Sequence, residues 1–430
     1  MLLAFSEVLL AGSKIFGLEQ YTLIIVSSAI LIVSFYFGMI AKKTNVPAVL
    51  LLIVLGIGLK FILDSMVGDA VDFLPILGVL GTVGLIMIVL EAALELELKE
   101  EKLIPIAKSF AIALIGLVGS MLAAAGILYY FIPGMSIQHA LLYATPLSIL
   151  SSAIIIPSVS DLREDKKEFH IYESTFSDIL GIIVFFYLES SLHAGGPGLG
   201  EYTLSILITI VASVVASYIL ILIFQNIRSH TKLFLLIATL LLLYALGKKF
   251  HLSSLIIILI FGLMISNMRL FFQGPLKKWL RYKEALHIYE GLHVITMETA
   301  FVVRTFFFVI FGLTISLASL YNLDVAIISV LIIVSIYLIR FIILRLFIGG
   351  DILPQLFIAP RGLITVLLFY SIPAGLVEGF DKGILLFIII ATCLIMTGAM
   401  IFDKRRSGLA IKKATENPVG YEKWKAPTLE

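Results

Sequence analysis

A short polar segment, Glu173-Ser174-Thr175-Phe176-Ser177-Asp178, lies inside a long apolar stretch of this sequence. If the segment is helical, Ser174 and Asp178 lie one turn apart, so a hydroxyl and a carboxylate share one face. Oxygen ligands of these two kinds suit a small, hard cation. A carboxylate that is buried without full compensation also retains a proton up to about neutral pH, and it can exchange that proton for a cation. The segment therefore predicts a shared cation and proton site at Asp178.

Ionisable side chains deep within apolar stretches are costly and usually reflect a function. Six residues are placed in this way: Glu91, Glu173, Asp178, Arg304, Arg340 and Arg361. Asp178 is the only aspartate among them, and we interpret it as functional because a lone buried carboxylate is expensive. Glu173 lies on a different helical face and is interpreted as a member of a structural ion pair. For Arg304 the sequence favours a pore-lining or interfacial cation.

Prolines give a second signal, in two apolar stretches that are far apart in the chain. The first stretch contains Pro146 and Pro157, among the hydroxyl residues Thr145, Ser148, Ser151 and Ser152. The second contains Pro354, Pro360 and Pro373, with Arg361-Gly362 directly after one of them. Membrane prolines alone are usually ordinary kinks. Interrupted helices in corresponding positions of two halves, however, indicate the substrate site of a transporter.

The whole chain has the composition of a polytopic membrane protein. Of its 430 residues, 60% are hydrophobic and 14% are charged, and the mean hydropathy is +1.10. Soluble globular proteins have roughly 45–50% apolar and about 25% charged residues. The composition therefore excludes a soluble enzyme, a disordered protein and a nucleic-acid binder with a basic face. The single cysteine, Cys393, excludes a disulfide framework and a cysteine-rich metal site.

The apolar stretches predict about thirteen transmembrane helices, since about 20 apolar residues cross the hydrocarbon core. The expected spans are 21–40, 48–62, 73–96, 109–132, 139–160, 171–192, 202–225, 233–247, 254–268, 296–318, 325–346, 352–374 and 383–402. The two proline-interrupted stretches are the fifth and the twelfth of these spans, and Asp178 lies in the sixth. An N-terminal segment (1–20), an amphipathic segment along the cytoplasmic interface (269–290) and a short cytoplasmic tail (403–430) complete the expected organisation.

Basic residues in the loops predict the orientation of these spans. Lysine and arginine cluster after spans one, three, five, seven and nine and in the C-terminal segment, whereas the alternate loops are nearly free of them. The loop between spans two and three carries Asp64, Asp69 and Asp72 instead. Under the positive-inside rule, the N-terminus lies outside the plasma (inner) membrane and the C-terminus lies in the cytoplasm. Lys248 and Lys249 fall on the opposite side and are the exception.

Several of these motifs together resemble the monovalent cation/proton antiporter superfamily of the sodium/proton exchanger type. Glu173-Ser174-x-x-Ser177-Asp178 resembles the family sequence E-S-x-x-N-D, and Leu90-Glu91-Ala92-Ala93-Leu94 resembles F-E-G-G-L. Arg361-Gly362 is similar to the L-R-G of a late broken helix, and Leu338-Ile339-Arg340 to a helix with a buried arginine. Asn45-Val46-Pro47-Ala48, with Gly56 and Gly58, resembles the second span of the family. The resemblance extends from about residue 20 to residue 402.

The resemblance implies an all-helical polytopic fold with two inverted repeats and interrupted, crossing helices. Repeat one would cover about 21–192, a linker span about 202–225, and repeat two about 233–402. The resemblance further implies a mobile core domain, a dimerisation domain and a homodimer.

The resemblance also implies roles for individual residues. Asp178 would carry the cation or the proton, with Ser174 and Glu91 beside it, and Glu173 would pair with Arg340. Arg361 would occupy the broken helix near the site. Ser177 replaces the family asparagine or aspartate; it is expected among the cation-binding residues, but it leaves Asp178 as the one ionisable position of the motif. The fifth span lacks the family T-D-P, and Ser151 and Ser152 are the residues expected to supply oxygen ligands there.

We therefore expect a secondary transporter, not an enzyme, that exchanges Na⁺, or else K⁺ or Li⁺, for H⁺ by alternating access. One ionisable ligand predicts one proton per cation, hence electroneutral exchange without a cofactor. A K⁺/H⁺ antiporter or K⁺ efflux system of the same fold, and a transport-inactive sensory subunit, stay open as alternatives. An intramembrane aspartyl protease needs two carboxylates that share a proton. Only Glu91 could serve there as the partner of Asp178.

Overall fold

The computed structural model describes residues 20–44, 46–66, 74–96, 98, 100–159, 162–192, 198–227, 232–249, 254–273, 278–314, 322–373, 375–377 and 380–416. In these ranges all regular secondary structure is helical. Residues 1–19 of the expected N-terminal segment, the loop aspartates Asp69, Asp72 and Asp161, and the last part of the expected tail, 417–430, lie outside the described residues.

The first half of the chain forms helices around one interruption. Their bounds are α2 Gln20–Thr44, α3 Ala48–Met66, α4 Leu74–Glu95, α5 Leu103–Phe131, α6 Ile137–Ser148, α7 Ser152–Ser158 and α8 Glu164–Ser191, with a 3₁₀ turn η1 at Glu100–Lys102. Helices α6 and α7 together fill the expected fifth span, and the chain between them is not helical.

The second half contains helices of more varied length. Their bounds are α9 Leu199–Phe224, α10 Lys232–Lys249, α11 Ser254–Ser266, α12 Met268–Phe271, α13 Tyr282–Thr314, α14 Leu323–Phe347, α15 Leu363–Ser371 and α16 Gly383–Glu416. In the part of the chain that the structure describes, eight segments are long and apolar enough to cross a membrane, and shorter apolar helices accompany them. Each of the thirteen expected spans contains at least one helix.

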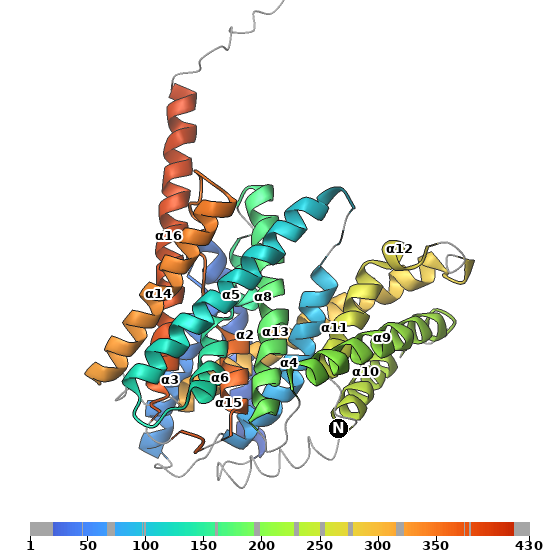
Figure 1. The fold of residues 1–430 in the computed structure, drawn as a ribbon, viewed down its shortest axis with the longest axis horizontal. Helices are drawn as coiled ribbons and strands as arrows, with labels where there is room; N and C mark the ends of the chain where they lie inside the picture. Colours follow the sequence, from blue (N-terminus) through green and yellow to red (C-terminus); the bar gives the residue numbers. More distant parts are fainter. Residues whose placement is uncertain are drawn as a thin grey trace, which may run out of the picture.

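The expected spans differ most from the structure at three places. Helix α13 begins at Tyr282, so the second half of the expected interfacial segment 269–290 forms its first turns. Helix α16 continues through the expected start of the tail to Glu416, where it projects beyond the other helices (Figure 1). In the twelfth span only α15 is an α-helix, because Pro354 and Pro360 have no backbone N–H to donate and disfavour the helical conformation in the residue before each of them.

Helix packing divides the molecule into two bundles. Helices α5, α6, α7, α8, α14, α15 and α16 pack mainly with one another and are called the first bundle. Helices α2, α3, α4, α9, α10, α11 and α13 form the second bundle. In Figure 1, α14 and α16 lie on the left, whereas α9, α10 and α11 lie on the right. The bundles meet where α4 packs against α15 and α8.

One close contact inside the second bundle depends on glycine. Gly56 of α3 and Gly312 of α13 face each other, and a Cβ atom on either would overlap the backbone of the other helix. Small residues of this kind let membrane helices approach closely, so that backbone packing joins them. The Gly56–Gly312 contact explains how α3 and α13 pack so extensively.

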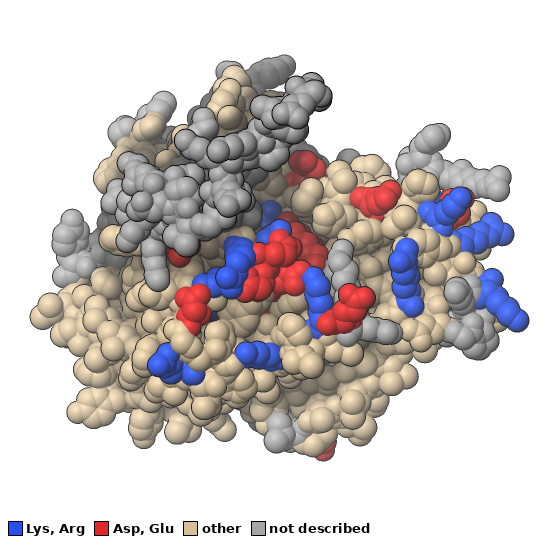
Figure 2. Space-filling view, turned by 90° about the horizontal axis from the view of Figure 1, so that it is seen from above, with Lys and Arg blue, Asp and Glu red and all other residues tan. Residues whose placement is uncertain are grey.

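Large apolar side chains cover much of the outer surface. They are especially frequent on α2 and α9, where residues such as Ile25, Tyr36, Leu204 and Val211 are exposed. Charged side chains have a different distribution: Figure 2 shows Asp and Glu side chains near the middle of one face, with Lys and Arg beside them. An apolar belt with charges at an end of the molecule is the distribution that a lipid bilayer requires.

Candidate ion-binding site

The interrupted segments of the two halves touch each other in the interior. Residues Ile149–Ser151 separate α6 from α7, and residues 358–362 precede α15 without helical structure. The Ser151 amide donates a hydrogen bond of 3.0 Å to the carbonyl oxygen of Pro360, which joins the two interruptions. Gly362 lies at the same point, where an added Cβ would overlap the Ser151 hydroxyl and approach the Ile154 side chain to 2.7 Å. The contact therefore needs glycine at residue 362.

Arg361 satisfies backbone groups at this contact. Its Nε donates to the Leu147 carbonyl oxygen at 2.9 Å, and its Nη2 donates to the Ser148 carbonyl oxygen at 3.3 Å. Nη1 donates to the Ala359 carbonyl oxygen at 2.7 Å. Leu147 and Ser148 end α6, so the guanidinium lies at the negative end of that helix dipole. Arg361 is 1% exposed, and its charge is stabilised by carbonyl oxygens.

Asp178 reaches the same region from α8. Its side chain is 2% exposed, and Oδ2 accepts a long hydrogen bond of 3.4 Å from the Ser152 amide. Within the described residues, Oδ1 is buried and has no hydrogen-bond partner. Since buried polar atoms normally have partners, a carboxylate oxygen without one indicates a place for a proton or a bound ion.

A small cavity of about 20 Å³ adjoins Asp178. Its other lining residues are apolar and come from both bundles: Ile88, Val89 and Ala92 of α4, Ile179, Ile182 and Ile183 of α8, Leu255, Ile256 and Leu259 of α11, and Ile364 of α15. A space of this size is comparable to that of one water molecule. Asp178 is thus the polar group of an otherwise apolar cavity between the two bundles.

The serines of the predicted site have different surroundings. The Ser174 hydroxyl donates to the His170 carbonyl oxygen at 2.7 Å, which still leaves its lone pairs for a ligand. The Ser177 hydroxyl accepts a 3.0 Å hydrogen bond from the Leu150 amide and so holds the α6–α7 interruption against α8. Ser151 contacts the site through its backbone amide, and Ser152 contacts Asp178 through its backbone amide and its side chain.

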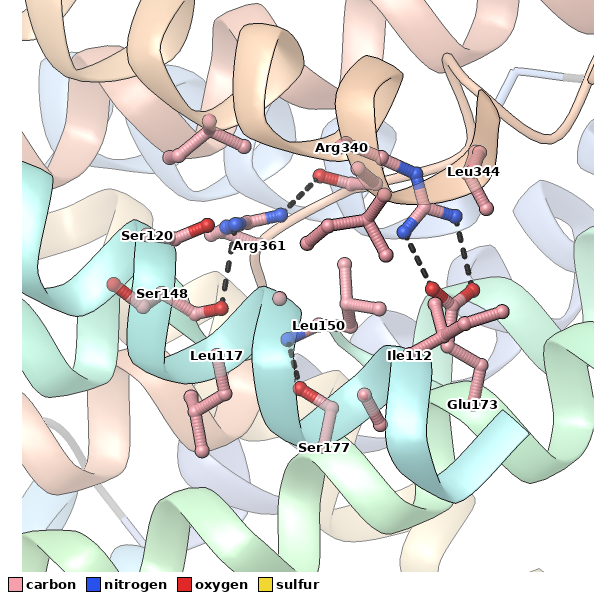
Figure 3. Close-up of a pocket in the computed structure, with 15 residues that line it drawn as sticks. Ile112, Leu117, Ser120, Ser148, Leu150, Glu173, Ser177, Arg340, Leu344 and Arg361 are labelled. Carbon is pink, nitrogen blue, oxygen red and sulfur yellow. Dashed lines mark hydrogen bonds and ion pairs between the residues drawn. The ribbon is translucent and has the colours of Figure 1, made fainter. Parts of the chain in front are cut away.

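Glu173 and Arg340 form a buried bidentate ion pair. Nη1 and Nη2 of Arg340 lie 2.6 and 2.9 Å from the two Glu173 carboxylate oxygens (Figure 3). Arg340 also donates to the carbonyl oxygens of Gln355 and Leu356. His170, one turn before Glu173, places Nδ1 3.5 Å from the same carboxylate. The pair fastens α8 to α14 and to the chain before Arg361.

A second cavity lies between this ion pair and Arg361. It has a volume of about 30 Å³ and is lined in part by the hydroxyl residues Ser120, Ser148 and Ser177 (Figure 3). A polar space of this size can hold about one or two water molecules. Ser177 lines this second cavity, whereas its neighbour Asp178 lines the apolar cavity. These two adjacent residues of α8 therefore face different cavities.

The remaining deep charges, Glu91 and Arg304, also form a pair. Nη1 and Nη2 of Arg304 on α13 lie 3.0 and 3.2 Å from the two carboxylate oxygens of Glu91 on α4. The sequence prediction placed Glu91 beside Asp178 and gave Arg304 no partner. The structure instead engages both oxygens of Glu91 with Arg304, inside the second bundle.

Comparisons with known proteins agree with this arrangement. The transmembrane sodium/hydrogen exchanger family matches residues 28–402, which is most of the chain. The chain belongs to the sodium/hydrogen exchanger family. Both the predicted superfamily and the predicted all-helical antiporter fold are therefore confirmed. No curated protein sequence matches the chain.

Solved structures of an antiporter resemble this exchanger-family chain in fold. The sodium proton antiporter MjNhaP1 from Methanocaldococcus jannaschii at pH 8 has a TM-score of 0.65 and 21% sequence identity, covering 90% of this chain and 99% of that one. An electron-microscopy structure of the same antiporter has a TM-score of 0.64 and 20% identity, covering 95% of this chain and 100% of that one. At such identities the likeness establishes the fold.

Sequence reasoning missed two features of this exchanger-family site. His170 lies three residues before Glu173, and that helical spacing alone could have placed it at the ion pair. The Glu91–Arg304 pair could have been found by elimination: once Glu173 is assigned to Arg340, Glu91 and Arg304 are the remaining deep charges of opposite sign besides Asp178 and Arg361.

Proposed function

We propose that this protein exchanges a monovalent cation, with Na⁺ as the first choice, for H⁺ across a membrane. The observation that carries the proposal is the Asp178 carboxyl group. It is buried at the contact of two interrupted helices, and within the described residues one of its oxygens has no partner. Membership in the sodium/hydrogen exchanger family supports the same conclusion.

In the proposed mechanism the two substrates compete for Asp178. The ionised carboxylate binds the cation, and the protonated carboxyl group releases it. Oxygens of Ser174, Ser151 and Ser152 are the proposed supporting ligands. Ser177 and Glu173 serve to hold the helices, since the Ser177 hydroxyl accepts from Leu150 and the Glu173 carboxylate is bound by Arg340. Glu91 is left out of the ligand set because Arg304 engages both of its oxygens.

Alternating access is proposed to occur between the two bundles. Asp178 belongs to the first bundle, and its cavity is closed by apolar residues of α4 and α11 from the second. The ion pairs Glu173–Arg340 and Glu91–Arg304 each lie within one bundle. At this cavity the boundary between the bundles is apolar, which supports movement of one bundle against the other. The hydrogen bond of 3.0 Å from the Tyr202 hydroxyl of α9 to the Ile183 carbonyl oxygen of α8 also crosses between the bundles and would have to break in such a movement.

The remaining topological expectations are also proposals. The loop charges support an external N-terminus and a cytoplasmic C-terminus. The paired interruptions of α6–α7 and of the chain before α15 support two repeats, about 21–192 and 233–402, on either side of the linker span about 202–225. A homodimer is proposed from family resemblance.

The test is a flux assay in proteoliposomes that carry an imposed pH gradient. Adding Na⁺ to wild-type vesicles should dissipate the gradient, and D178N should reduce the rate to that of empty vesicles because the asparagine cannot exchange a proton. D165N is the matched control: Asp165 is an exposed carboxylate at the start of the same helix, and its loss should leave the rate unchanged. Exchange by D178N at the wild-type rate would refute the proposal.

The same assay separates the alternatives. A series with Na⁺, Li⁺ and K⁺ identifies the cargo, and dissipation by K⁺ alone would assign a K⁺/H⁺ antiporter. Wild-type protein that responds to none of the three cations would support a transport-inactive sensory role.

A further inference from the structure

The Glu91–Arg304 pair lies close to the apolar cavity that contains Asp178. Ile88, Val89 and Ala92 of α4 line that cavity, and Glu91 directly precedes Ala92 on the same helix. Glu91 is therefore at the same depth in the membrane as the cavity wall, on the side of α4 that faces α13. The two side chains of the pair are 11% and 21% exposed, so water screens their charges weakly.

Few other charges face this pair. Glu95 follows one turn later on α4 and interacts electrostatically with both Glu91 and Arg304. The sequences of α11 and α15, which pack against α4, contain no Asp, Glu, Lys, Arg or His, and Tyr370 of α15 is the one phenol among them. From α8, which also packs against α4, Asp178 faces the cavity, while Glu173 is occupied by Arg340. Arg304 donates to both oxygens of Glu91 and is therefore the counter-charge of that carboxylate.

We propose that Arg304 determines the cation affinity of the transport site by neutralising Glu91, which leaves Asp178 as the one uncompensated carboxylate beside the cavity. This inference rests on the proposed exchange function and adds a residue to it. Glu91 is thereby a charge partner of Arg304 and not a ligand of the cation.

Removing Arg304 and removing Glu91 should have opposite effects on the affinity of the Asp178 site for a cation. Without Arg304, the free Glu91 carboxylate attracts a cation at Asp178; without Glu91, the free Arg304 guanidinium repels it. The axes of packed helices lie about 8–10 Å apart, and we take about 10 Å as the separation between these charges and the Asp178 site. At an effective dielectric constant of about 25 to 50, one unit charge at that distance changes binding roughly threefold to tenfold. Replacing both residues removes both charges and should restore the original affinity.

The experiment measures the apparent KM for Na⁺ at fixed pH in proteoliposomes with wild type, R304Q, E91Q and E91Q/R304Q. We expect R304Q to lower the KM roughly threefold to tenfold and E91Q to raise it by a similar factor. E91Q/R304Q should match wild type. A purely structural role would reduce the amount of folded protein in both single variants without moving the KM in opposite directions.

Three results would overturn the inference: the same KM in all four proteins, shifts of equal sign in the two single variants, or a raised KM in E91Q/R304Q. The last result would make Glu91 a direct ligand of the cation. If the single variants fail to fold, the double variant still decides the test, because it leaves neither Glu91 nor Arg304 as an unpaired buried charge. Failure of the exchange function itself is distinct, since wild-type vesicles would then show no Na⁺-dependent flux at all.

Discussion

Two buried arginines of the first bundle are stabilised in different ways. Arg340 is held by the Glu173 carboxylate as well as by the carbonyl oxygens of Gln355 and Leu356. Arg361 is held by the carbonyl oxygens of Leu147, Ser148 and Ala359. The Glu173–Arg340 pair is neutral as a unit, whereas the Arg361 charge is met by backbone carbonyl oxygens. At the residue scale, Arg340 joins α8 to α14, and Arg361 joins the end of α6 to the chain before α15.

Removing one member of the Glu173–Arg340 pair should be strongly destabilising. R340A leaves the Glu173 carboxylate buried without a counter-charge, and E173A does the same to the guanidinium. Either change should lower the free energy of unfolding by about 3–5 kcal/mol. Thermal unfolding of the purified protein in detergent measures the effect.

The double variant E173L/R340M provides the control for this pair. A buried ion pair can often be replaced by apolar residues of similar volume with little loss, so the double variant should recover much of the stability. If R340A is as thermostable as wild type, the pair does not hold α8 and α14 together.

At the scale of elements, the contact between the two interrupted helices depends on Gly362. In G362A the new methyl group would overlap the Ser151 hydroxyl and force the Ser151–Pro360 hydrogen bond apart. Overpacking of this kind should cost about 1–3 kcal/mol of unfolding free energy. Ser152 directly follows Ser151, and its amide donates to Asp178. A displacement of Ser151 in G362A should therefore also weaken Na⁺ exchange. Thermal unfolding and the flux assay report the two effects.

G126A is the matched control for the same substitution. Gly126 lies inside α5, and an added Cβ there would meet no atom within 4 Å. Alanine favours a helix over glycine by roughly 0.5–1 kcal/mol, so G126A should be as stable as wild type or slightly more so. Equal changes in the unfolding free energy of G362A and G126A would show that the contact between the two interrupted helices tolerates a side chain at residue 362.

At the scale of the whole molecule, the sequence predicted the spans because hydrophobicity reports directly on the bilayer. It also predicted both interruptions, since proline acts locally on the backbone. It did not predict that Ser177 would face one cavity and Asp178 another, because that depends on how α8 is rotated against α5 and α4. The partner of Arg304 was missed for a similar reason: the contact joins residues 213 positions apart, and only packing brings them together.

Charge balance across the first bundle predicts electroneutral exchange. Glu173 and Arg340 cancel, and Arg361 contributes one positive charge. Asp178 contributes no net charge either when it is protonated or when it binds one monovalent cation, so the two loaded forms carry equal charge. Since Ser177 cannot ionise, it adds no second proton to the cycle.

The electroneutral prediction is tested at flux reversal. Net Na⁺ flux should vanish when the Na⁺ concentration ratio across the membrane equals the H⁺ ratio. A potassium diffusion potential set with valinomycin should not move that point, because a 1:1 cycle transfers no charge. Each additional proton per cycle would instead couple the cycle to the potential by about 2.3 kcal/mol per 100 mV. A reversal point that shifts with the applied potential would therefore disprove the 1:1 stoichiometry, while leaving Asp178 as the shared site.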